Sequence, residues 1–360
     1  MAVCCIMAPK KHMDDLIIVI WIISLICTTL VASHAMSARI NEYRASSDAN
    51  DKSQIVHIDP QDATLHTDVF FGTFVNRISR LSMKESNFDV DFYIWFNWKG
   101  NNVSPGEGLQ IVNGQISLKQ MQAEWHEGDN HYEQYHVIAG IIKPFDIMLF
   151  PFDNHNLTVE IEDSLNSIYE LQYVPENTQN ISISPEISSI HGYSIKYLYP
   201  VSKLHEYSPD FGSPWKDTIP SVYSRISFGI GIARDGYGIY FKLFQSLFVA
   251  VAAAMLGFFF RPNYAPRFIV GIGALFASVA NYYNILSMQP IVGFVTLADS
   301  INLIGILTIL LSLIQSSISL HMYDNLGKKK QSRRFDKYSV VTFIFCYIFI
   351  NWWIFEIASH

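Results

Sequence analysis

Cysteine is almost absent from this sequence, and its absence limits how the fold can be held together. The four cysteines are Cys4, Cys5, Cys27 and Cys346, so residues 36–235 contain none. No disulfide framework can therefore stabilise that region. Positive charge is also scarce, because the formal net charge at pH 7 is -7. Without a clustered basic face, we expect no binding of nucleic acid.

Motifs for catalysis are missing as well. The sequence has no G-x-S-x-G motif, no phosphate-binding loop and no paired-cysteine metal motif. Its most suggestive cluster is residues 125–136, WHEGDNHYEQYH, where His126, Glu127 and His131 resemble part of a zinc-protease helix. These histidines are five residues apart instead of four, so they would not share one helix face. We expect no enzyme, no cofactor and no metal centre; the cluster is either a solvated acidic turn or a sensor of protons or divalent cations.

Charged residues are few, at 16% of the chain, whereas 50% of the residues are apolar, which is high for a soluble protein. Lys10 and Lys11 precede an apolar run at residues 16–32. Small residues follow near Ala35 and Ala38. This pattern predicts a secretory signal peptide over residues 1–38, followed by a linker over residues 39–54. An uncleaved membrane anchor is the alternative.

Two regions of different character follow. Residues 55–235 alternate between apolar and polar positions, as in FDVDFYIWFNW at 88–98, which predicts short strands and an immunoglobulin-like β-sandwich. Residues 236–358 contain four long apolar stretches of the length that spans a bilayer. These predicted spans are residues 239–260, 268–286, 294–320 and 338–357. The predicted fold is a multi-domain α and β membrane protein, with the sandwich preceding a four-helix transmembrane bundle.

Basic residues place the connections between the predicted spans. Arg261 and Arg267 bracket the first connection, and a second basic group occupies the third. That group is Lys328, Lys329, Lys330, Arg333, Arg334 and Lys337. By the positive-inside rule both connections face the cytoplasm. The β-domain then lies on the extracellular or periplasmic side of the plasma membrane.

Residues 143–157, KPFDIMLFPFDNHNL, carry the most specific pattern in the chain. The motif residues are Pro144, Asp146, Phe150, Pro151 and Asp153. This segment resembles the signature loop of the pentameric ligand-gated ion channels, the Cys-loop receptor superfamily. Lys143 and Leu157 stand where that family has two bridged cysteines, with the same thirteen residues between them. Loss of this bridge is typical of prokaryotic members, so the resemblance implies a protein of the bacterial inner membrane.

Other positions extend the resemblance over about residues 55–358. They match a strand-ending tryptophan, a basic residue before the first helix, the start of the pore helix, a linker proline and an aspartate of the third helix. These residues are Trp98, Arg234, Ala265, Pro266, Arg267, Gly271, Ile272, Pro290 and Asp299. The usual proline near the outer end of the first helix is absent, with Gln245 and Ser246 there instead. The resemblance implies a homopentamer that binds an unidentified small-molecule agonist and conducts inorganic ions.

The second predicted span, residues 268–286, is rich in small and polar residues, which suit close packing or a water-facing stripe. One helical face carries Ile269, Gly273, Phe276, Ala280, Tyr283 and Ser287. In a five-membered ring this face would line a pore, and Phe276 would close it by dewetting. Arg267 at the cytoplasmic mouth would then favour anions. The alternatives are ordinary helix packing for Phe276 and a snorkelling helix anchor for Arg267.

The resemblance also implies an agonist site between neighbouring β-domains, caged by aromatic residues. We expect Tyr93 and Trp95 on one side, with Tyr207 and Trp215 in the capping loop on the other. Aromatic faces hold cationic amines by cation-π attraction. Each of these side chains also suits a sandwich core or surface.

A gating interface is implied where the signature loop meets the linker after the pore helix. Its candidate residues are Asp146, Phe150, Pro151, Asp153, Arg234 and Pro290. Aspartate and proline build tight turns whether or not they transmit gating. A second hypothesis of another class is a membrane-anchored β-sandwich sensor or adhesion receptor that conducts nothing.

Overall fold

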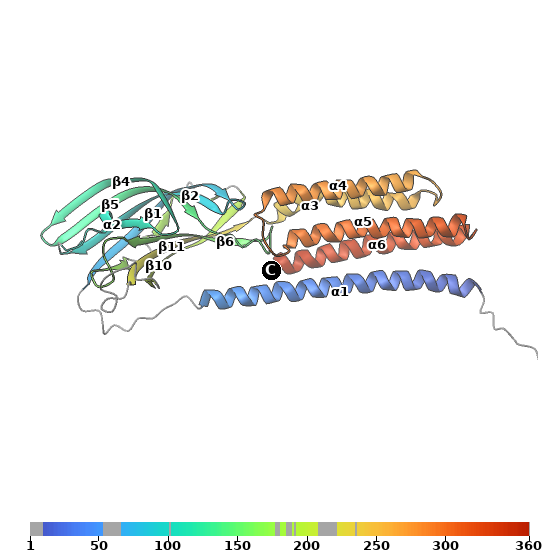
Figure 1. Cartoon of the computed structure of the whole chain (residues 1–360), viewed down its shortest axis with the longest axis horizontal. Helices are drawn as coiled ribbons and strands as arrows, with labels where there is room; N and C mark the ends of the chain where they lie inside the picture. Colours follow the sequence, from blue (N-terminus) through green and yellow to red (C-terminus); the bar gives the residue numbers. More distant parts are fainter. Residues whose placement is uncertain are drawn as a thin grey trace, which may run out of the picture. The chain divides into compact units, whose positions relative to one another are not determined.

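The computed structural model describes residues 10–52, 66–100, 102–176, 181–184, 189–190, 192–207, 222–234 and 236–359. The chain divides into two compact units. One contains the strands, and the other contains the helices (Figure 1). The segment Ile147–Phe152, in the middle of the signature loop, belongs to the helical unit although the strands on both sides belong to the β unit.

The β unit consists of two sheets. The first has the order β4 (Gly114–Glu127), β5 (Asn130–Ile142), β2 (Asn87–Lys99), β1 (Thr67–Ser82) and β7 (Leu171–Pro175), with β8 (Ile181–Ile183) also paired to β1. The second has the order β3 (Leu109–Ile111), β6 (Asn154–Asp163), β11 (Val222–Arg234), β10 (Tyr193–Glu206) and β9 (Ser189–Ile190). One helical turn, α2 (Pro105–Gly108), precedes β3. The predicted β-sandwich is confirmed.

Period-two patterning explains why the two sheets pack face to face. In β2 the residues Phe88, Val90, Phe92, Ile94 and Phe96 are buried, and the residues between them point away from the core. The facing strands β6 and β11 bury Leu157, Val159, Ile161, Ile226, Phe228 and Ile230. Across the core, the rings of Phe92 and Phe228 lie edge to face with centroids 5.2 Å apart. Removal of these side chains from water is the main force that holds the sandwich together.

The helical unit contains the four predicted spans. They are α3 (Gly236–Leu256) with its short extension η4 (Gly257–Phe259), α4 (Pro266–Met288), α5 (Leu297–Asp324) and α6 (Lys329–Ser359). At the start of α5, Asp299 and Thr296 form a reciprocal capping box. Where α4 and α5 approach, a Cβ atom on Gly271 would lie 2.4 Å from the Leu313 side chain. The chain is a multi-pass membrane protein by its helix composition.

A further long helix, α1 (Lys10–Lys52), precedes the β unit. The sequence predicts a signal peptide over residues 1–38 and a linker over residues 39–54. In the structure one continuous helix runs from Lys10 in the first segment to Lys52 in the second. Its sequence contains neither glycine nor proline, the residues that interrupt helices most strongly. The segment Val19–Glu42 is also long and apolar enough to span a membrane.

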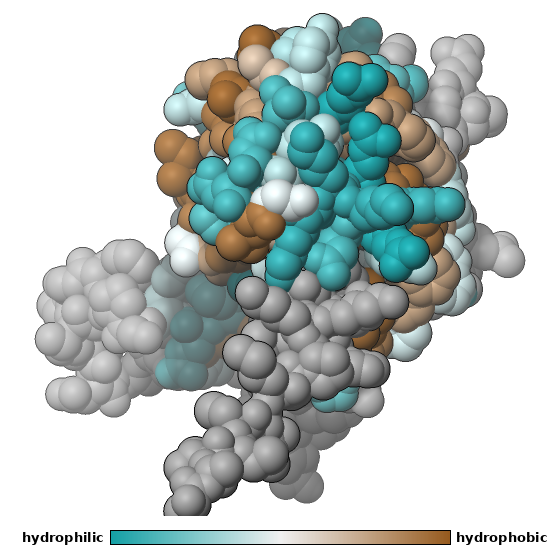
Figure 2. All heavy atoms as spheres, turned by 90° about the vertical axis from the view of Figure 1, so that its right-hand side faces the viewer, coloured by the Kyte–Doolittle hydropathy of each residue, from teal (hydrophilic) through white to brown (hydrophobic). Residues whose placement is uncertain are grey.

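The end of the helical unit where α5 connects to α6 is strongly hydrophilic (Figure 2). In the first turns of α6 the residues Lys329, Lys330, Arg333, Arg334 and Lys337 are exposed, whereas Ser332, Phe335 and Asp336 are buried. This separation of charge matches the positive-inside pattern expected for a cytoplasmic end.

Candidate functional site

Helix α4 exposes the face predicted to line a pore. Ile269, Gly273, Phe276, Ala280, Tyr283 and Ser287 are all exposed in the single chain. Phe276 alone exposes 73% of its surface. The opposite face of α4, with Gly271, Ala274, Ser278, Asn281 and Ile285, is buried against the rest of the unit. The six exposed residues are therefore free to face lipid, water or another copy of the chain.

The exposed face of α4 differs from those of α5 and α6, whereas α3 also exposes the polar Gln245 and Ser246. Along their central turns, α5 exposes Leu303, Leu307, Leu310 and Ile314, and α6 exposes Val341, Ile344, Phe345, Ile348 and Trp352. These side chains are uniformly large and apolar, as contact with lipid requires. Among the exposed residues of α4 are the small or polar Gly273, Ala277, Ala280, Asn284 and Ser287. The exposed residues of α4 therefore include small and polar as well as large apolar side chains, whereas a helix surrounded by lipid would expose large apolar side chains only.

Arg267 is not exposed, which corrects the expectation of a positive ring at the pore mouth. Only 2% of the residue is accessible. Its guanidinium donates two hydrogen bonds of 2.8 Å to the two carboxylate oxygens of Asp336, and one of 3.0 Å to the Ser316 hydroxyl. It also lies over the ring of Phe258, 5.2 Å from the centroid. With its charge paired inside the chain, Arg267 no longer provides a reason to expect anion selectivity.

Helical periodicity explains this correction. Arg267 lies four residues before Gly271 and so belongs to the buried series, while Ile269 begins the exposed series on the opposite side. Asp336 was missed as a partner although it is the one acidic residue among the basic residues between Lys328 and Lys337. Membrane helices rarely contain an unpaired charge. A single carboxylate among these basic residues could therefore have been predicted to pair with a cation on another helix.

A second polar network joins three helices nearer the middle of the unit. The Asn281 amide of α4 donates a 3.0 Å hydrogen bond to the Asn302 amide oxygen of α5, and Ser246 of α3 donates to Asn281. Buried hydrogen bonds of this kind bind transmembrane helices together. Their presence ties α4 to both neighbours on its buried side.

The signature loop packs on the helical unit through its middle segment. The amide of Leu297, at the start of α5, donates a 2.9 Å hydrogen bond to the Met148 carbonyl. The Phe152 ring lies against Tyr240 of α3 and Phe355 of α6, with centroid distances of 5.7 and 5.4 Å. Phe150 and Pro151 are buried, and Pro290 is half-buried in the connection from α4 to α5. The sequence predicts that the loop contacts the connection from α4 to α5. Its hydrogen bond is instead to the first residue of α5, directly after that connection.

Asp153 and Arg234, two further residues of the predicted gating interface, form a buried ion pair within the β unit. Arg234 donates hydrogen bonds of 2.8 and 3.1 Å to the two oxygens of Asp153, and His155 lies 2.5 Å from the same carboxylate. Burial alone would raise the pKa of Asp153, but the hydrogen bond with His155 and the charge of Arg234 hold that pKa below its usual value. Asp146, another residue of the predicted interface, is exposed.

We expect Asp153→Asn to destabilise the protein by about 3–5 kcal/mol at neutral pH, because it removes the buried carboxylate charge with which Arg234 forms an ion pair. The folded pKa is lowered, so the ionised carboxylate stabilises the fold above its unfolded pKa of about 3.9 and loses this effect as pH falls. Thermal unfolding of the wild type and the variant should therefore converge in strong acid. Asp89→Asn is the control, since its partner Arg80 is exposed. An equal deficit at all pH values would contradict the role of the charge.

Tyr93 and Trp95, predicted ligand residues, lie on the outer face of the first sheet. Tyr93 stacks on His136 with centroids 4.7 Å apart, and His136 lies 2.8 Å from an oxygen of Asp91. The Trp95 indole donates a 3.2 Å hydrogen bond to Glu176. These aromatic rings are held by polar partners at the surface and are not part of the sandwich core. They provide a preorganised surface with aromatic and acidic groups.

Tyr207 lies with charged partners on the other sheet. Its hydroxyl donates a 2.7 Å hydrogen bond to Glu162, which also accepts from Arg225. Burial, then the bond to Glu162, raises the pKa of Tyr207. Glu162 and Arg225 were not identified from the sequence, because their pairing depends on the register between β6 and β11. Trp215 lies outside the described residues. Tyr93 lies in β2 of the first sheet, whereas Tyr207 directly follows β10 of the second, so one chain does not bring them together.

The histidine cluster forms the tip of the hairpin between β4 and β5. Nδ1 of His126 lies 2.7 Å from Nδ1 of His131, and Nε2 of His126 lies 2.7 Å from Glu124. His131 stacks on Trp98. The two histidines occupy different strands, so the helical arrangement of a zinc protease is excluded here. Among the described residues, no group of three or more His, Cys, Asp and Glu side chains is placed to hold a metal ion.

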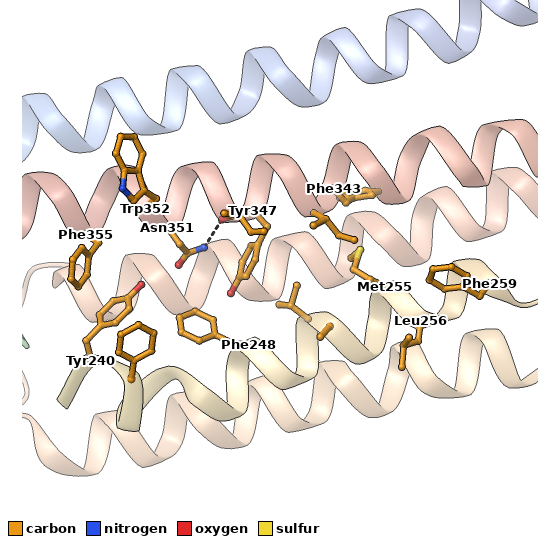
Figure 3. A pocket seen from close by; sticks show the side chains of 15 residues that line it. Tyr240, Phe248, Met255, Leu256, Phe259, Phe343, Tyr347, Asn351, Trp352 and Phe355 are labelled. Carbon is orange, nitrogen blue, oxygen red and sulfur yellow. Dashed lines mark hydrogen bonds between the residues drawn. The ribbon is translucent and has the colours of Figure 1, made fainter. Parts of the chain in front are cut away.

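A groove of about 670 Å³ runs between α3 and α6 (Figure 3). Its walls are mainly aromatic and aliphatic, including Tyr240, Phe248, Met255 and Phe343. Asn351 donates a 2.8 Å hydrogen bond to the Tyr347 carbonyl of its own helix. Because this lining is apolar over most of its length, the groove suits an acyl chain of the bilayer and not an ion.

No protein-family model matches this chain, and no curated protein matches it.

Proposed function

We propose that the protein is a ligand-gated ion channel, in which five copies surround a pore lined by α4. The observation that carries this proposal is the mixed exposed face of α4. Asn284 and Ser287 are exposed there, although polar groups are costly to place against lipid. In a ring of copies this face would meet water, and small residues such as Gly273 and Ala280 would leave space for ions.

The signature loop supports a route from the β unit to the pore. Met148 is hydrogen-bonded to Leu297, the first residue of α5, which follows the connection from α4. A displacement of the loop would therefore act on the helix joined directly to the pore lining. Two neighbouring copies would bring Tyr93 and Trp95 of one chain near Tyr207 of the next, forming the agonist site. The agonist is a small molecule, a proton or a divalent cation.

Ion selectivity in this proposal does not depend on Arg267, whose charge is paired with Asp336. The basic end of the helical unit would face the cytoplasm and the β unit the outside of the plasma membrane. A non-conducting receptor with the same two units would have no need of polar residues on the exposed face of α4.

Reconstitution of the purified full-length protein tests the proposal. We expect single particles with five-fold symmetry and, in planar bilayers, currents evoked by acidic buffer, Zn²⁺ or a panel of primary amines applied to the β-unit side. Empty vesicles treated identically are the control. Monomeric particles, or five-fold particles that pass no current under all these conditions, would favour the non-conducting receptor instead.

A further inference from the structure

Helix α1 contacts the rest of the helical unit through one continuous face. Leu25, Ser33 and Ile40 are buried, and the last of these exposes only 1% of its surface. Ile22, Thr29 and Met36 on the same face are half-buried, so the contact residues recur every three or four positions. The other faces expose Ile20, Ile23, Ile26, Leu30 and Val31, as a helix surrounded by lipid would.

The contacts of α1 with α6 run in the same order along both helices. The ring of Trp21 meets Phe335 edge to face at 6.4 Å. Thr29 lies beside the Cys346 thiol, and the Trp353 indole donates a 3.1 Å hydrogen bond to the Ser37 hydroxyl. The two helices are thus parallel and in contact over roughly 25 Å, most of the thickness of a bilayer core. Figures 1 and 3 show α1 running beside α6.

We propose that α1 is retained in the mature protein as a fifth transmembrane helix, docked parallel to α6 of the same chain. This inference goes beyond channel activity and is independent of it. Cleavage near residues 35–38 would remove Trp21, Leu25 and Thr29 and leave their sites on α6 uncovered. The candidate span Val19–Glu42 is also longer than the apolar core of a signal peptide.

The direction of the helix agrees with charge. Because α1 is parallel to α6, Lys10 and Lys11 begin α1 at the same end of the unit as the basic residues that begin α6. Both ends would be cytoplasmic under the positive-inside rule. The following chain then emerges on the opposite side of the membrane, where the β unit is expected.

Disulfide trapping against the native Cys346 tests this docking. Cys4, Cys5 and Cys27 are first replaced by serine, and Thr29→Cys is then introduced into the full chain. The matched control is Thr28→Cys, since Thr28 is the same residue type but lies on the exposed side of α1. Membranes are oxidised with copper phenanthroline and denatured, and free thiols are counted with a maleimide polymer on non-reducing gels.

The number of labels separates the outcomes. We expect no label on the Thr29→Cys chain, which should migrate as a monomer, and two labels on the Thr28→Cys chain. Two labels on both would mean that α1 is present but not docked on α6. One label on both would mean that residues 28 and 29 have been removed by processing. A disulfide-linked dimer would place α1 on a neighbouring chain; each of these three results would overturn the proposal.

Discussion

Replacing Phe276 with serine is expected to raise the current that flows without agonist by about tenfold or more. In the proposed ring, five Phe276 side chains form an apolar constriction that excludes water from the closed pore. A hydroxyl at each position would wet that constriction. Tenfold corresponds to about 1.4 kcal/mol in favour of the conducting state. Current in planar bilayers at zero agonist, normalised to the amount of reconstituted protein, measures the change.

Phe345→Ser is the matched control for this experiment. Phe345 lies on the uniformly apolar face of α6 and exposes 70% of its surface in the single chain, close to the 73% of Phe276. We expect it to leave the resting current unchanged, because its position faces lipid in the proposed assembly. If both variants left an otherwise agonist-responsive current unchanged, Phe276 would not be the gate. If both raised it equally, the change would reflect general loosening of the helices.

Replacing Arg267 with methionine is expected to cost about 3–5 kcal/mol of stability, the usual effect of breaking a buried ion pair. The variant leaves the Asp336 carboxylate buried, with Gln315 still donating a 3.1 Å hydrogen bond to it. The ion pair joins α4 to α6, so its loss should also loosen the anchoring of α4 at this end. A lower midpoint of thermal unfolding in detergent, followed by size-exclusion chromatography, measures the effect.

The double variant Arg267→Met, Asp336→Leu distinguishes an unpaired charge from a loss of packing. Apolar pairs of similar volume often replace buried ion pairs without loss of stability, so we expect most of the midpoint to be recovered. Arg261→Met is the control, because Arg261 is exposed. If the double variant conducts, its reversal potential in a NaCl gradient should equal that of the wild type, because a paired arginine carries no selectivity. A shifted reversal potential would restore Arg267 as part of the ion pathway.

The two faces of α4 show how much the residue pattern predicts. Spacing of three and four residues placed Ile269, Phe276 and Tyr283 on one exposed face, and the structure agrees. Arg267 was predicted to lie at the pore mouth because of its charge, although it is four residues from Gly271 and shares that residue's buried face. Only the position of Asp336, on another helix, shows that this charge is neutralised.

Residue patterning alone therefore determined the architecture. Alternation of period two predicted the strands of the sandwich, and long apolar runs predicted the membrane spans. Both patterns reflect which side chains of each element are removed from water. The tertiary structure decided which polar groups meet. Arg267 with Asp336, Glu162 with Arg225, and Ser37 with Trp353 come from distant parts of the chain, and no local pattern encodes their pairing. Such contacts depend on strand register and helix rotation, which the packing of the whole unit sets.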